Sequence, residues 1–124
     1  MSRKRIIIVN NDIHILRLLK QNAKKFCPYC EISVATSGSM ALEYIKHSHV
    51  RSFDLMVTDY NLPSMSGLDL AKTARQAWPN MRIVLTVAPS EISDLKDSFG
   101  SLNFDGYMQK PLKMDAFQKM LQLA

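Results

Sequence analysis

The sequence predicts an α/β fold in which a parallel sheet is covered by helices on both faces. Five short, mostly apolar stretches alternate along the chain with five segments whose apolar residues recur at helical spacing. Strands of this kind are typical of a sheet buried on both faces, and a helix between successive strands makes their pairing parallel. The chain has 124 residues, 47% of them hydrophobic, which is one domain's length with enough apolar side chains for its own core. We therefore treat residues 1–124 as one domain.

The predicted strands are short runs bounded by polar residues or turn formers. They cover Ile6–Val9, Glu31–Ala35, Phe53–Thr58, Arg82–Val87 and Gly106–Gln109. Runs of this length favour buried strands over helices, which need longer periodic segments.

The predicted helices follow the strands. The first has Ile13, Leu16 and Leu19 on one apolar stripe, and Asp12 stands at its expected N-cap. The second is a short helix around Met40 and Ile45, with Ser37 or Ser39 as its cap; the others are expected at Gly67–Ala77, Ser90–Phe99 and from Met114 to about Leu121. The Gly67 helix ends before Trp78-Pro79, as helices tend to do before proline.

Charge and hydropathy exclude several classes of protein. The net charge is +5, but the only tight basic run is Arg3-Lys4-Arg5, so a solvated surface is favoured over a nucleic-acid-binding face. Nothing approaches the roughly 20 apolar residues that span a bilayer. The stretch Ile6–Val9 is also too short for a signal peptide, which needs roughly 7–15 apolar residues. We expect a cytoplasmic protein without a membrane partner.

Both cysteines lie in Cys27-Pro28-Tyr29-Cys30, which matches the redox motif of glutaredoxins. A redox motif of this type follows a strand and opens a helix, whose N-terminus favours the thiolate. Here the helical pattern precedes the motif and a strand follows it. We therefore expect a helix–strand turn with reduced thiols.

A candidate site lies where the predicted strands end. Asp59 follows the third strand, and Tyr60–Gly67 is a loop rich in turn-forming residues. Lys110 directly follows the fifth strand. Because the carboxyl ends of parallel strands meet at one edge of a sheet, we expect Asp59 and Lys110 to lie close together.

These features resemble the receiver domain of bacterial two-component response regulators, along essentially the whole chain. The resemblance rests on the Asp59 loop with Leu62-Pro63-Ser64-Met65-Ser66-Gly67, the helix ending at Pro79, and Tyr107 three residues before Lys110-Pro111. It implies a flavodoxin-like, doubly wound sheet with strand order 2-1-3-4-5. It also implies a regulatory phosphoacceptor domain of a phosphorelay, and no enzyme.

The family's roles carry over to matching positions. In the family, the aspartate after strand three takes a phosphoryl group from a sensor histidine kinase, and Mg²⁺, a hydroxyl side chain and a lysine offset the charge. The resemblance makes Asp59 the phosphoacceptor, Lys110 the lysine, Tyr107 the switch aromatic and Asn61 the donor of a backbone carbonyl to the metal.

Two departures weaken the predicted site. The family's acidic pair falls on Asn10 and Asn11, and Mg²⁺ prefers carboxylates. Asp12 is expected to cap the first helix more than to bind metal. The expected metal ligands are therefore weak: Asn11, Asp59 and the Asn61 backbone, with Asn10 and Asp12 as further candidates.

The hydroxyl position is the second departure. Counting from Asp59 without gaps places the Thr/Ser slot on Val87, which cannot hydrogen-bond a phosphoryl group. Thr86 is its neighbour, and neighbours on a strand face opposite sides. Only a register slip between the strands would bring Thr86 to the site.

We expect a receiver-like signalling module that is weakly or not phosphorylated at Asp59 and acts through protein–protein contacts. The alternative is a fully functional phosphoacceptor. A flavodoxin-like cofactor binder or redox protein is a distant third reading, because no glycine-rich phosphate loop is present. Expected partners are a sensor histidine kinase or phosphotransfer protein and an output domain of the same protein, which alone would contact nucleic acid; a homodimer is compatible with the pattern.

Overall fold

The computed structural model describes residues 3–47, 52–96 and 104–124. Its elements are β1 (Arg5–Val9), α1 (Ile13–Phe26), β2 (Glu31–Ala35), α2 (Gly38–Lys46), β3 (Leu55–Asp59), α3 (Gly67–Ala77), β4 (Arg82–Val87), the 3₁₀ turn η1 (Pro89–Glu91), α4 (Ile92–Lys96), β5 (Gly106–Gln109) and α5 (Met114–Leu121). In this described part, no helix has both the length and the apolar character needed to cross a membrane.

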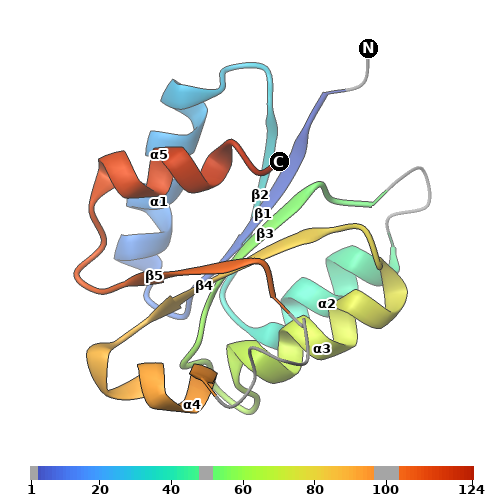
Figure 1. The fold of residues 1–124 in the computed structure, drawn as a ribbon. Coiled ribbons are helices and arrows are strands. Elements are labelled where there is room, and N and C mark those ends of the chain that lie inside the picture. The colour runs from blue at the N-terminus through green and yellow to red at the C-terminus, as the bar shows by residue number, and fades with distance from the viewer. Residues whose placement is uncertain (1–2, 48–51, 97–103) are drawn as a thin grey trace.

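The strands form one parallel sheet in the order β2-β1-β3-β4-β5. Helices α1 and α5 lie together on one face, while α2 and α3 cover the other (Figure 1). The order reverses at β1, whose neighbours are β2 and β3, so the carboxyl ends of β1 and β3 lie at a topological switch point. The predicted fold class and strand order are confirmed.

Local sequence explains where the helices begin. The Asp12 side chain accepts hydrogen bonds from the N–H groups of His14 and Ile15 at the start of α1. Ser37, and not Ser39, caps α2 by accepting from Met40, and Ser66 caps α3 in the same way. These side chains satisfy N–H groups that a helix leaves without partners in its first turn.

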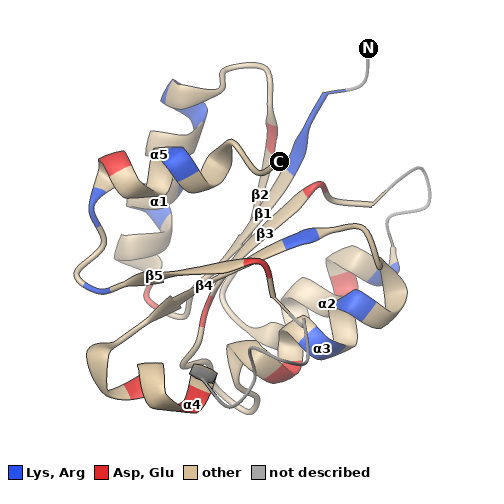
Figure 2. Ribbon diagram, in the orientation of Figure 1, with Lys and Arg blue, Asp and Glu red and all other residues tan. Residues whose placement is uncertain are grey.

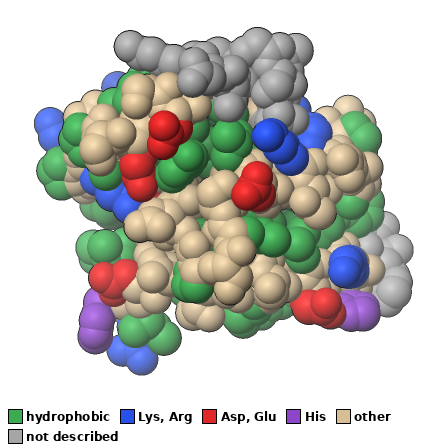
Figure 3. All heavy atoms as spheres, turned by 90° about the horizontal axis from the view of Figure 1, so that it is seen from below, with side chains coloured by type: hydrophobic (Ala, Val, Ile, Leu, Met, Phe, Trp, Pro, Cys, Tyr) green, Lys and Arg blue, Asp and Glu red, His purple; other side chains and the backbone are tan. Residues whose placement is uncertain are grey.

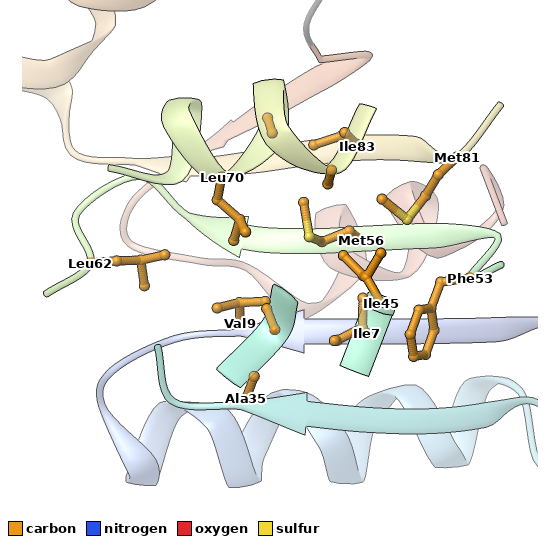
Figure 4. Packing of buried hydrophobic residues seen from close by; sticks show 13 residues of the cluster. Ile7, Val9, Ala35, Ile45, Phe53, Met56, Leu62, Leu70, Met81 and Ile83 are labelled. Carbon is orange, nitrogen blue, oxygen red and sulfur yellow. The ribbon is translucent and has the colours of Figure 1, made fainter. Parts of the chain in front are cut away.

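A hydrophobic core fills each side of the sheet. Between the sheet and α2 and α3, Phe53, Met56 and Ile45 pack with other fully buried side chains (Figure 4). On the other side, Ile8, Val57 and Phe117 belong to the cluster beneath α1 and α5. Residues from β1, β3 and β4 contribute to both clusters, as expected for central strands without polar alternation.

Several boundaries and one bond differ from the sequence-based expectations. Strand β3 begins two residues later and ends one residue later than expected, so that it includes Asp59, and Phe53 is buried outside it. The fourth helix is divided into η1 and α4, and its expected last residues, 97–99, lie outside the described residues. Strand β1 starts at Arg5.

The expectation of reduced thiols is wrong, because Cys27 and Cys30 form a disulfide. The position of the motif is as predicted, between the end of α1 and the start of β2. The turn brings the two Cα atoms to 5.4 Å, within the range that a disulfide spans.

Candidate functional site

Asp59 is a buried carboxylate at the carboxyl end of β3. Its side chain is 5% exposed, and the Lys110 ammonium lies 2.6 Å from its Oδ1. The Thr86 hydroxyl donates a hydrogen bond to the same oxygen at 3.0 Å. The predicted meeting of Asp59 and Lys110 is confirmed, and a hydroxyl that was not expected joins them.

Backbone hydrogen bonds hold the segments that carry these side chains. The Tyr60 N–H donates to the Thr86 carbonyl at 2.9 Å, and the Lys110 N–H donates to the Val87 carbonyl at 2.8 Å. The Gly67 N–H closes the loop after Asp59 by donating to the Tyr60 carbonyl at 2.6 Å. The position of Asp59 is therefore set by main-chain contacts to β4 and α3.

The assignment of the hydroxyl position to Val87 needs correction. Asp59 and Thr86 are direct partners across β3 and β4, so their side chains project from the same face of the sheet. Val87 faces the other way and is buried with Leu85 and Leu95. The ungapped count failed because cross-strand register decides which side chain reaches Asp59. The sequence did contain a signal for Thr86. It is a hydroxyl residue in an otherwise apolar strand, and a buried hydroxyl needs a hydrogen-bond partner such as the Asp59 carboxylate.

Two side chains before α1, those of Asn10 and Asp12, accept hydrogen bonds from backbone N–H groups at the start of this helix. Asn10 is 3% exposed and its Oδ1 accepts the N–H of Asp12 at 2.8 Å. Asp12 in turn uses its Oδ1 for the N–H groups of His14 and Ile15, at 2.9 and 3.3 Å. The expected capping role of Asp12 is confirmed. Asn11 is exposed, as is Asn61 in the loop after β3.

Two tyrosines connect the site to α4. Burial, together with the nearby Asp94 carboxylate, raises the pKa of Tyr60, whose hydroxyl lies 3.4 Å from Asp94 Oδ2. Tyr60 therefore stays protonated and can donate to that carboxylate. Tyr107 is partly buried against the cluster that contains Val87 and Leu95. The link from Tyr60 to Asp94 was not predicted, since no spacing rule relates residues 34 positions apart.

The family model described as the response regulator receiver domain matches residues 6–122. The chain belongs to the receiver family. This receiver is 22% identical over 118 residues to the chemotaxis protein CheY of Pseudomonas aeruginosa, covering 94% of the chain and 92% of that protein. It is 21% identical to the transcriptional regulatory protein CitT of Halalkalibacterium halodurans, covering 94% of the chain but only 50% of CitT.

Solved structures agree in fold. A receiver domain protein from Clostridium thermocellum has a TM-score of 0.86 at 18% identity, with 96% of this receiver and 91% of that chain covered. A CheY-like receiver domain protein from Methanospirillum hungatei has a TM-score of 0.85 at 26% identity, covering 98% and 92%. Receivers are regulatory modules of two-component signalling, which is therefore this chain's class.

Two side-chain oxygens that Mg²⁺ would need near Asp59 already have partners within the protein. Within residues 3–47, 52–96 and 104–124, no group of three or more His, Cys, Asp or Glu side chains could hold a metal ion. Asp59 would be the main carboxylate ligand, but Lys110 and Thr86 already contact its Oδ1. The Asn10 oxygen accepts a backbone N–H. Mg²⁺ demands near-ideal oxygen geometry, and a neutral amide supplies no charge to offset its dehydration.

Removing the Thr86 hydroxyl should destabilise the protein measurably. We expect Thr86→Val to lower the free energy of unfolding by about 1.5–3 kcal/mol, the range for hydrogen bonds to charged groups. The measurement is urea denaturation followed by circular dichroism. The matched control is Val87→Thr, which should also cost stability because it buries a hydroxyl in an apolar cluster, without changing the Asp59 environment. Unchanged stability in Thr86→Val would contradict the hydrogen bond.

Proposed function

We propose that this receiver is a signalling module with Asp59 at the phosphoacceptor position and a weak metal site, so that it is phosphorylated slowly and acts mainly through protein–protein contacts. The observation that carries the proposal is the pairing of Asp59 with Lys110 at 2.6 Å, together with a buried amide, Asn10, directly after the neighbouring strand β1, where the family has a metal-binding carboxylate. Asp59 thus has its charge offset by lysine in the resting protein.

The chemistry that Asp59 would perform is transfer of a phosphoryl group from a phosphohistidine. A carboxylate oxygen attacks phosphorus, the P–N bond breaks, and the histidine nitrogen takes up a proton as it leaves. Lys110 would move from the carboxylate to the phosphoryl oxygens, and the Thr86 hydroxyl would donate to them. Both groups stand where negative charge develops, which is the arrangement that stabilises such a transition state.

The second candidate is a receiver that is phosphorylated at an ordinary rate. It is favoured by one observation, the Thr86 hydroxyl 3.0 Å from Asp59, because the family's hydroxyl contact is thereby available. The two candidates share the fold and differ in how strongly the site binds Mg²⁺.

Proposed partners follow from the surface. A histidine kinase or phosphotransfer protein would approach at the carboxyl edge of the sheet, where α1 begins. On the first turns of α1, Ile13, Ile15 and Leu18 are 51%, 38% and 53% exposed, and a group of exposed apolar side chains would suit a protein contact. Hydrophobic side chains are spread among charged ones on the face seen in Figure 3. The surface formed by α4, β5 and α5, which includes Tyr107, would bind an output domain or a second copy of this chain.

The deciding experiment is a titration with Mg²⁺ and beryllofluoride, a phosphoryl mimic, followed by amide NMR. The proposal expects no saturable shift at Asp59, Thr86 or Lys110 up to millimolar Mg²⁺. Saturable shifts that vanish in Asp59→Ala would overturn the weak metal site and establish the second candidate. An Asn10→Asp, Asn11→Asp double variant serves as the positive control, since it restores both carboxylates and should bind more tightly.

A further inference from the structure

The turn between α1 and β2 carries the disulfide that the proposed function does not use. Cys27 caps the carboxyl end of α1, its N–H donating to the Ala23 carbonyl, and Cys30 directly precedes β2. Tyr29 between them is 81% exposed, and both cysteines are partly exposed. The turn lies at the amino edge of the sheet, opposite the edge that holds Asp59 (Figure 1).

Cys30 lines an open pocket of about 430 Å³ that is rich in basic side chains. Arg3, Arg5 and Lys24 line it together with Glu31. Arg5 and Glu31 form an ion pair at 3.1 Å, so the excess positive charge comes from Arg3 and Lys24. Lys and Arg mark both the beginning of β1 and the end of α1 in Figure 2. The pocket therefore suits a small anion, and Cys30, one half of the disulfide, lies in its lining.

We propose that Cys27–Cys30 is a thiol–disulfide exchange site for a small anionic thiol that binds in this pocket. The inference does not rest on the proposed phosphoacceptor function. The charge and the bond point to the same class of ligand, because Arg3 and Lys24 attract carboxylates and the disulfide reacts with thiolates.

The reaction balances with two equivalents of the small thiol. Its thiolate attacks Cys30 Sγ, a mixed disulfide forms, the Cys27–Cys30 bond breaks, and the electron pair leaves on Cys27 Sγ, which takes a proton from water. A second thiolate then attacks the small thiol's sulfur in the mixed disulfide and releases the Cys30 thiolate, which is also protonated. The protein gains two electrons and two protons, and the small thiol is oxidised to its disulfide.

The two cysteines differ in their surroundings. Cys27 ends α1 and does not line the pocket, whereas Cys30 does. Arg3 and Lys24 would hold an anionic thiol beside Cys30, because the cations attract its carboxylates. Cys30 is therefore the residue that carries the mixed disulfide.

The first test compares glutathione, an anionic thiol, with neutral 2-mercaptoethanol as reductants of the intact, unreduced protein. The rate of reduction is followed by mass spectrometry after alkylation. We expect Lys24→Gln to lower the ratio of the glutathione rate to the 2-mercaptoethanol rate by about two- to fivefold, the effect of one surface ion pair. Arg3→Gln should act alike, and the double variant should show a larger loss.

The matched control is Lys20→Gln, which removes the same charge from the same helix without lining the pocket. Its rate ratio should equal that of the wild type. If the rate ratio fell equally in Lys20→Gln and Lys24→Gln, or fell in neither, the proposal that the anionic thiol binds in this pocket would be wrong. Two free thiols in protein purified without reductant would overturn the disulfide site altogether.

A second measurement assigns the reacting sulfur. With oxidised glutathione, Cys27→Ser should form the mixed disulfide on Cys30 several-fold faster than Cys30→Ser forms it on Cys27, both variants being checked for folding by circular dichroism. Equal rates, or a faster reaction at Cys27, would refute the assignment to Cys30. Because this readout is a protein mass, it is independent of phosphorylation at Asp59.

Discussion

Lys110→Met will lower the free energy of unfolding by about 3 kcal/mol, the low end of the cost of breaking a buried ion pair. The variant leaves the Asp59 carboxylate, 5% exposed, without its cation. The low end applies because Lys110 is itself 34% exposed and water can replace part of the contact. Urea denaturation at neutral pH measures the loss.

A double-mutant cycle separates this effect from lost packing. Asp59→Asn removes the charge, so Lys110→Met should cost much less in the Asp59→Asn background than in the wild type. Lys72→Met, at an exposed position of α3, is the control for removing a lysine and should change stability by no more than about 0.5 kcal/mol. Equal costs of Lys110→Met in both backgrounds would show that the ion pair contributes nothing.

Gly67→Ala will destabilise the protein by about 1–3 kcal/mol, as overpacking does. A Cβ at Gly67 would meet the Asp59 carbonyl oxygen and lie 2.9 Å from Tyr60 Cα, and both are backbone atoms that cannot rotate away. The Gly67 N–H must also keep its 2.6 Å bond to the Tyr60 carbonyl. Thermal unfolding gives the stability, and NMR shifts at Asp59 and Thr86 report whether the site moves.

Gly106→Ala is the matched control. A Cβ at Gly106 would meet the flexible Met120 side chain at 3.9 Å, an ordinary contact. This variant should be neutral or slightly stabilising, because alanine has less freedom to lose on folding. If both glycine variants unfolded at the same temperature, close backbone approach at Gly67 would not be the reason for glycine there.

The periodic parts of the fold were predictable from the sequence. The bounds of α1, α3 and β4 follow directly from apolar spacing, from the Asp12 cap and from Trp78-Pro79. The family match supplied the strand order, which spacing alone does not determine. The start of β3 was missed because Phe53 is buried next to the strand without belonging to it.

Within the candidate site, residues at strand ends were easier to predict than residues within strands. Asp59 and Lys110 could be brought together because parallel strands end at one edge. The choice between Thr86 and Val87 depends on the pairing Asp59↔Thr86 across β3 and β4, which requires the exact length of the intervening connection. The disulfide could not be predicted, since a matching spacing does not fix the Cα–Cα distance.

The main-chain contacts around Asp59 have a further consequence for how such a domain can diverge. The scaffold that positions Asp59, Thr86 and Lys110 consists of peptide N–H and carbonyl groups of residues 60, 67, 86, 87 and 110. Every residue type but proline supplies an N–H. Residues 10 and 11 supply none of these groups, so a change of side chain there leaves this scaffold as it is. A domain built in this way can vary its ion-binding side chains while its fold, and any surface that a partner contacts, stays the same.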